Sequence, residues 1–272
     1  MRFRKRNYHA FLWHAGFLAL TSAFTDMNTV LPSLVVKAGG GTVLIGLLTA
    51  IMVGTPILGQ LLLASYLHMK RRKKGFLLLG IKLRVVALAA VSLILYRSAS
   101  LPAATLITLV FLLMFLFSSA GTFAAVSYTD ILGKSLQPQR RGSFFVNRQI
   151  ITSLAILASA PISRWILKTH EYPYNYIWLF GLASLLLLVA SGGFWYLREP
   201  VIEPADDAQS FMAVLRAIPR QLRECPQLRH HIFLVNLTGF GLTLMPFYVA
   251  YASQHHGLTG EQVGSYLMVQ IV

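Results

Sequence analysis

Long apolar runs alternate with short polar segments along the whole chain. A run of about 18 or more apolar residues is long enough to cross the hydrocarbon core of a bilayer as a helix. A membrane β-barrel would instead show short segments of alternating polarity. The pattern therefore predicts an all-α, polytopic membrane protein in contact with the lipid bilayer. We expect spans at residues 10–36, 42–67, 75–96, 101–128, 144–167, 174–197 and 231–252, with an eighth beginning near residue 263.

The spacing of these runs divides the chain into three parts. Six spans fall within residues 1–197, a long polar connector occupies 198–230, and apolar runs resume over 231–272. The last run, ending in "GSYLMVQIV", is too short to cross the bilayer and meets no polar stop. We therefore expect a six-span bundle, a central loop, and the truncated start of a second bundle.

The connector carries a helical pattern of its own. An apolar stripe with arginines off the stripe is typical of an amphipathic helix lying at a membrane surface. The alternative is a solvated loop with accidental periodicity, because Pro219 shortens the pattern. The stripe consists of Phe211, Val214, Leu215, Ile218 and Leu222, and the arginines are Arg216, Arg220 and Arg223.

Charge is scarce and unevenly placed. Only 12% of the residues are charged, against roughly 25% in a typical soluble domain. The net charge of +15 does not indicate a nucleic-acid partner, because the basic residues lie in short loops rather than on one soluble face. Basic clusters at 2–6, 70–74, 134–141 and 198–229 fall on one side of the expected spans, against Lys37, Arg97 and Lys168 on the other. This bias predicts a cytoplasmic N-terminus in a multi-pass protein of the cell's inner (plasma) membrane.

Two of the basic loops and the first span carry recognisable motifs. The loop after the second span, "GQLLLASYLHMKRRKKGFLLLG", has a glycine, a basic cluster and a second glycine: Gly59, then Lys70 to Lys74 with Arg72 and Lys73, then Gly75. The loop after the fourth span, "YTDILGKSLQPQRRGSFFVNRQ", contains Asp130, Pro138, Arg140, Arg141 and Gly142. The first span and its outer loop read "FTDMNTVLPSLVVKAGGGTVLIGLLTAI".

In this order, the three stretches resemble the major facilitator superfamily of secondary transporters. The loop after the second span departs from the family pattern, because the usual acid before its basic cluster is missing. The resemblance implies two six-span bundles, each an inverted pair of three-span repeats, joined by a long cytoplasmic loop. It also implies transport of a small-molecule substrate by alternating access, with the loops containing Gly59 and Asp130 at a cytoplasmic gate. The second bundle would be required for transport.

Asp26 is the acid that falls within an apolar run. It lies about ten residues from the outer end of its span, or roughly 15 Å at the helical rise, which is near the midplane. At three- or four-residue spacing, Ser22 and Thr29 share its helix face, with Thr25 and Asn28 nearby. The sequence supports two interpretations: a carboxylate that binds a proton or cation in a wet cavity, or a structural acid paired with a buried base.

Arg84 is a base at a matching depth. It lies nine residues past Gly75, or about 13.5 Å from the cytoplasmic face. Depth alone permits a pair with Asp26, whereas Lys82 faces another way and can reach toward the surface. We treat Arg84 as a candidate cavity residue.

The loop between the fourth and fifth spans places Asp130 and Arg148 close to the cytoplasmic surface. An ion pair between them could latch the inner gate. The alternative is two independent interfacial charges, since surface pairs contribute little.

Small residues recur every four positions in the second span, at Gly46, Ala50 and Gly54. Such a stripe lets helices approach closely, so we expect a packing role.

The remaining patterns exclude other classes. The pairs His230–His231 and His255–His256 lack further ligands at metal spacing, so neither a metal nor another cofactor is expected. No hydrolase or zinc-protease motif is present, and an enzyme is not expected. The rival function is a transporter-like membrane sensor or scaffold without transport.

Overall fold

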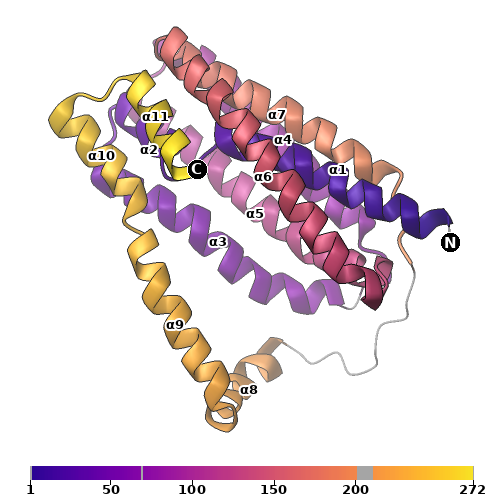
Figure 1. Cartoon of the computed structure of the whole chain (residues 1–272). Helices are drawn as coiled ribbons and strands as arrows, with labels where there is room; N and C mark the ends of the chain where they lie inside the picture. Colours follow the sequence, from indigo (N-terminus) through magenta and orange to yellow (C-terminus); the bar gives the residue numbers. More distant parts are fainter. Residues whose placement is uncertain (1, 69, 201–210, 272) are drawn as a thin grey trace.

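The computed structural model describes residues 2–68, 70–200 and 211–271. Apart from one short 3-10 turn, the regular structure in these ranges is α-helix, and no strand occurs there (Figure 1). The helices are α1 (Arg2–Phe24), α2 (Val30–Lys37), α3 (Thr42–His68), α4 (Lys74–Tyr96), α5 (Ala103–Ser135), α6 (Pro138–Thr169), α7 (Tyr174–Trp195), α8 (Phe211–Glu224), α9 (Pro226–Leu242), α10 (Met245–His256) and α11 (Gly260–Ile271).

Five of the described helices are long and apolar enough to cross a bilayer. They are α4, α5, α6, α7 and the first 19 residues of α3. The predicted class, a polytopic α-helical membrane protein, is therefore confirmed. The helices α5 and α6 each extend several residues beyond the predicted spans, into the basic turn that joins them.

The expected first span is not one helix. It is broken between α1 and α2 at residues 25–29. This segment, "TDMNT", is rich in short polar side chains, which compete with helical hydrogen bonds and favour turns. Pro32 fits the first turn of α2, where a backbone N–H has no helical partner to lose. The expected seventh span is likewise divided, into α9 and α10, with Pro246 in the first turn of α10.

The first seven helices pack in a pattern that shows an internal repeat. The main packing pairs are α1 with α6 and α7, α4 with α5 and α7, and α3 with α5. Suppose that α1–α2 corresponds to α5, α3 to α6, and α4 to α7. When each element is replaced by its counterpart, the packing pair α1–α6 becomes α5–α3, and the pair α1–α7 becomes α5–α4. The pair α4–α7 maps onto itself. The packing is thus unchanged by the exchange, as a 3+3 repeat requires.

Aromatic side chains pack α1 against α5, α6 and α7. Phe11 of α1 is fully buried and makes edge-to-face contacts with Tyr128 of α5, Phe144 of α6 and Phe194 of α7, at ring-centroid distances of 5.0, 6.3 and 5.4 Å. Close approach of α4 to α5 depends on Gly80, where a Cβ would lie 2.6 Å from the carbonyl oxygen of Ala120. The core therefore fixes α1, α4, α5, α6 and α7 relative to one another.

The last two helices reach back to the first bundle. The helix α11 packs on α6, and α10 packs on α2 and α3, whereas α9 stands apart from the bundle (Figure 1). The predicted helix of the central connector is present as α8. Residues 201–210 of the 198–230 connector, and the side chains of Phe211, Val214 and Leu215, lie outside the described residues, so the membrane-surface position of α8 stays a prediction.

Candidate functional site

The turn between α1 and α2 is organised by Asp26. Its Oδ1 accepts hydrogen bonds from the N–H of Asn28 (2.9 Å), the N–H of Thr29 (2.8 Å) and the hydroxyl of Thr29 (2.8 Å). The carbonyl oxygen of Asp26 also accepts the N–H of Leu31, at 3.0 Å. This is the geometry of an Asx turn leading into a helix. The negative charge lies beside the N-terminus of α2, where the helix dipole favours it.

This turn corrects the expected arrangement around Asp26. Because the helix ends at Phe24, Asp26 does not share a continuous helical face with Ser22 and Thr29. The hydroxyls of Ser22 and Thr25 instead bond back to carbonyl oxygens of α1. One sequence signal could have predicted the break. Asp26 and Thr29 come just before an apolar segment, and such short polar residues in this position are typical of the start of a helix.

A pocket borders the turn. Asn28 and Thr29 line an open cavity of about 490 Å³ between the first bundle and the two C-terminal helices. The opposite walls are formed by α10 and α11. Their lining residues are Met245, Tyr248, Val249 and Ala252 of α10, and Tyr266, Val269 and Gln270 of α11. The broken first span is thus brought against the start of the second bundle.

Arg84 of α4 lies against α5. Its guanidinium carbon is 4.2 Å from the centroid of the Phe117 ring, and its Nε would be 3.6 Å from a Cβ at Gly121. The Nε atom is buried, and Arg84 makes no hydrogen bond or ion pair with any described residue. The pair with Asp26 that depth alone permitted is not formed; Asp26 binds within its own turn.

Arg148 faces Tyr128 rather than Asp130. Its guanidinium carbon lies 5.9 Å from the centroid of the Tyr128 ring. Asp130 instead forms ion pairs with Lys73 of the preceding basic loop (2.8 Å) and Lys134 (2.6 Å). The expected Asp130–Arg148 latch is therefore corrected: the acid of the fourth span joins the two basic loops to each other.

His14 of α1 completes this group. The imidazole ring of His14 is buried, and its centroid lies 4.3 Å from the centroid of the Phe194 ring and 6.2 Å from that of the Tyr128 ring. The Nδ1 atom of His14 lies 3.3 Å from the carbonyl oxygen of Ala190. The hydroxyl of Tyr128 is buried without a described partner. Neither His14 nor Tyr128 was a sequence candidate, because neutral polar side chains in apolar runs give little signal by themselves.

A second acid organises the basic loop after α3. The carboxylate of Glu199 accepts the N–H of Lys73 at 2.7 Å and the N–H of Lys74 at 2.9 Å, at the start of α4. Lys74 Nζ donates in turn to the carbonyl oxygens of Trp195 and Leu197, each at 2.8 Å. The loop that lacks its own acid thus receives two from elsewhere, Asp130 and Glu199. Glu199 was missed because it follows the sixth span, far away in sequence.

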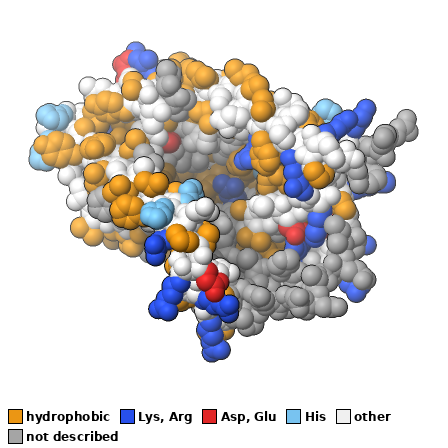
Figure 2. Space-filling model, turned by 60° about the horizontal axis from the view of Figure 1, so that its bottom comes forward, with side chains coloured by type: hydrophobic (Ala, Val, Ile, Leu, Met, Phe, Trp, Pro, Cys, Tyr) orange, Lys and Arg blue, Asp and Glu red, His pale blue; other side chains and the backbone are white. Residues whose placement is uncertain are grey.

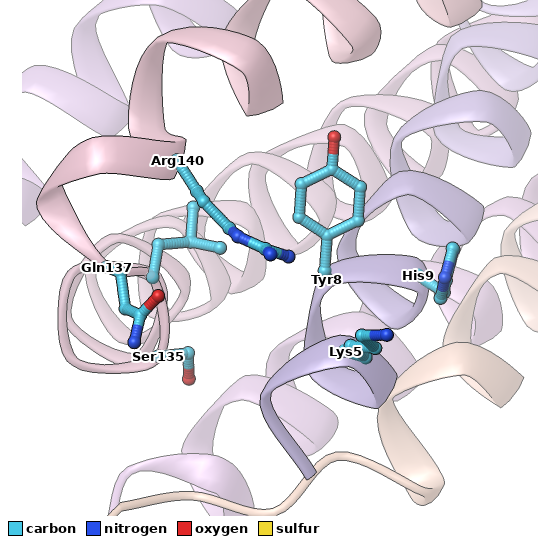
Figure 3. A pocket seen from close by; sticks show the side chains of 7 residues that line it. Lys5, Tyr8, His9, Ser135, Gln137 and Arg140 are labelled. Atoms are coloured by element: carbon cyan, nitrogen blue, oxygen red, sulfur yellow. The ribbon is translucent and has the colours of Figure 1, made fainter. Parts of the chain in front are cut away.

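The remaining gate-loop candidates lie at the same end of the bundle. Gly59 packs on Thr122, because a Cβ at Gly59 would lie 2.9 Å from Cγ2 of Thr122. Arg141 donates a hydrogen bond to the carbonyl oxygen of Gly133 at 3.2 Å. Arg140 points toward Tyr8 across a cavity of about 350 Å³ that Lys5 and His9 also line (Figure 3). Arg72 is exposed, and a Cβ at Gly75 or Gly142 would meet nothing within 4 Å.

The small-residue stripe of α3 is only partly in contact with another helix. A Cβ at Gly46 would lie 3.4 Å from the ring of Phe247 on α10, whereas Ala50 is exposed and Gly54 has open space around it. Their packing role stays a prediction.

A tighter contact joins α11 to α6. A Cβ at Gly260 would overlap the carbonyl oxygen of Leu167, and one at Gly264 would lie 2.7 Å from the Cα of Arg164. Beside these glycines, Oε1 of Glu261 accepts from Lys168 (2.8 Å) and Arg164 (3.4 Å). The hydrogen bond from Lys168 lowers the pKa of Glu261, so the ion pair persists at neutral and mildly acidic pH.

The fold and these contacts define an all-helical membrane protein whose expected first span is broken and packs against the C-terminal helices. Residues 12–272 match the family model of the Major Facilitator Superfamily. The chain therefore belongs to this superfamily of membrane transporters, as its loops indicated. No curated protein sequence gives a significant match.

Proposed function

We propose that this protein is a secondary active transporter that moves a small solute by alternating access. The observation that carries the proposal is the break in the first span at 25–29, whose residues Asn28 and Thr29 border the pocket against α10 and α11. Broken helices whose polar ends face a cavity between two bundles are the usual binding elements of such transporters. A complete second bundle is required for the cycle. The basic end of the bundle faces the cytoplasm, in the cell's inner membrane.

The second part of the proposal is proton coupling at Asp26. All three side-chain hydrogen bonds at this carboxylate go to Oδ1, and no described residue donates to Oδ2. A proton could therefore bind Oδ2 while Oδ1 continues to hold the turn. This division lets one residue serve both a structural and a coupling role.

The test separates these two roles. Asp26→Asn keeps an Oδ1 acceptor but cannot titrate, whereas Asp26→Ala removes both functions. In proteoliposomes carrying the transporter with both bundles, we expect Asp26→Asn to abolish solute uptake driven by a pH gradient while the protein stays folded. Solute exchange without a gradient should persist in this variant.

Unchanged gradient-driven uptake by Asp26→Asn would remove the coupling role and leave Asp26 as a turn residue. Absence of solute flux in the unsubstituted transporter would overturn the transport proposal itself. We expect the 272-residue chain alone to give no flux, and flux from it would show that the second bundle is dispensable.

A further inference from the structure

Two arginines in the first bundle have no carboxylate partner among the residues that the structure describes. Arg84 of α4 lies against Phe117 of α5, and Arg148 of α6 lies against Tyr128 of α5, whose ring also faces His14 of α1. Neither arginine forms an ion pair or hydrogen bond with a described residue. Charge in a membrane-spanning segment is costly and is normally paired or functional. The unpaired state of both arginines therefore requires an explanation.

The acids of the described chain are engaged elsewhere. Asp26 holds its own turn, and Asp130 pairs with Lys73 and Lys134. The others lie at the ends of the bundle or outside it: Glu171 in the loop before α7, Glu199 at the start of α4, Glu224 beside Arg220 on α8, and Glu261 beside Lys168. No acid in the described ranges serves Arg84 or Arg148.

Two buried donors in this region also lack acceptors among the described residues. The Nε of Arg84 and the hydroxyl of Tyr128 are both buried without a described hydrogen-bond partner. Buried polar groups in native proteins are nearly always satisfied by protein, ordered water or a ligand, so these donors border a place that such a partner can occupy. Since arginine can only donate, and a tyrosine hydroxyl readily donates, the missing partner must be rich in acceptors.

The geometry aligns these groups along one face of α5. Phe117 and Gly121, which contact Arg84, and Tyr128, which faces Arg148 and His14, recur at helical spacing on that face. Gly121 and Tyr128 are seven residues apart, or about 10.5 Å along the helix. The positions of α5 that the two arginines contact are thus about two turns apart. The molecular surface is hollowed at the middle of the face seen in Figure 2, and Lys or Arg side chains are visible inside the hollow.

We propose that Arg84, Arg148, His14 and Tyr128 form a binding site for a small anion carrying carboxylate or phosphate groups. The guanidinium fork matches the oxygen pairs of these groups, and the anion neutralises two charges that have no partner among the described residues, of which Arg84 has its Nε buried and Arg148 is half-buried. As a statement about transported substrate, this rests on the proposed function. As a statement about binding, it stands on the two unpaired arginines.

The test measures binding by the full chain purified in detergent. Thermal unfolding is followed with inorganic phosphate, succinate and glucose 6-phosphate, with glucose as the uncharged control, all at one ionic strength. We expect at least one anion to raise the melting temperature and glucose to have no effect. Arg84→Gln and Arg148→Gln should each weaken the apparent affinity by about tenfold or more, whereas Arg97→Gln, in the exposed loop after α4, should not.

Arg84→Lys separates the effect of charge from that of shape, because lysine keeps the positive charge but lacks the planar guanidinium. The Arg84→Lys protein should bind the anion more weakly than the unsubstituted protein and more tightly than the Arg84→Gln protein. Melting temperatures measured without ligand show which variants are folded. If Arg84→Gln is not folded, the binding affinity of Arg148→Gln tests the proposal. The proposal is overturned if no anion stabilises the protein more than glucose does, or if Arg97→Gln weakens binding as much as the two site variants. Anion binding without flux would refute transport but not the site, and flux of uncharged solutes without anion binding would do the reverse.

Discussion

At the scale of single residues, two of the described carboxylates act on backbone N–H groups. Asp26 binds those of Asn28 and Thr29, and Glu199 binds those of Lys73 and Lys74. In both places the acid lies at the start of a helix, where unpaired N–H groups and the helix dipole favour negative charge. Two features that depend on acids, the break in the first span and the shape of the basic loop before α4, therefore have the same physical basis.

Glu199→Ala should destabilise the protein by about 1.5–3 kcal/mol, because backbone N–H groups at the start of α4 lose a charged acceptor. Glu199→Gln keeps an acceptor oxygen and should cost less. Thermal unfolding in detergent measures both. The matched control is Glu224→Ala, which removes an exposed pair with Arg220 on α8 and should change stability by less than about 0.5 kcal/mol. Equal effects of Glu199→Ala and Glu224→Ala would contradict the capping role.

Asp26→Ala should also destabilise the protein, by about 0.5–2 kcal/mol, as loss of a helix-start residue does. Asp26→Asn should cost less, because its amide oxygen can still accept from Asn28 and Thr29. The measurement is again the melting temperature. Equal loss in the two variants would show that the charge of Asp26, rather than its Oδ1 acceptor, holds the turn.

At the scale of helices, close backbone contact at two glycines accompanies the packing of α11 on α6. Gly260 and Gly264 let α11 approach α6, and Glu261 adds an ion pair beside them. The sequence analysis favoured the stripe in α3 for such packing. The spacing of four is present in both helices, and only the neighbouring helix decides which stripe is in tight contact.

Gly264→Leu should move α11 away from α6 by about 2 Å, because the interaxial distance follows the side chains at the contact. Spin labels at the exposed positions Trp165 and Tyr266, with Cys225 replaced by serine, report the distance. Gly239→Leu is the control, since a Cβ there meets nothing within 4 Å. An unchanged distance distribution in Gly264→Leu would show that the glycine is not needed for the contact.

At the scale of the whole molecule, the packing pairs are unchanged when the two three-span repeats are exchanged. An inverted repeat with an odd number of spans puts equivalent ends of its two copies on opposite sides of the membrane. The basic residues break this equivalence, since they gather at one end. Charge therefore determines the orientation, which the repeat alone would leave undefined.

Orientation is tested with the single native cysteine. Cys225 is exposed between α8 and α9, at the basic end of the predicted topology, and should resist a membrane-impermeant maleimide applied to intact cells. Ser98→Cys, in a chain whose Cys225 is replaced by serine, should react. The opposite labelling pattern would invert the predicted topology.

The sequence alone determined the class of protein, the number and order of its apolar runs, and the motifs of its basic loops. These depend on composition and spacing, because a bilayer demands long apolar helices wherever the chain crosses it. It did not determine the partners of Asp130, the role of Glu199, or the group around Arg84. Several of those contacts join segments that lie more than a hundred residues apart in the sequence, such as Lys73 with Glu199 and His14 with Ala190. Only the packing of the helices brings such residues together, so the tertiary structure decided which polar groups are paired and which are left for a ligand.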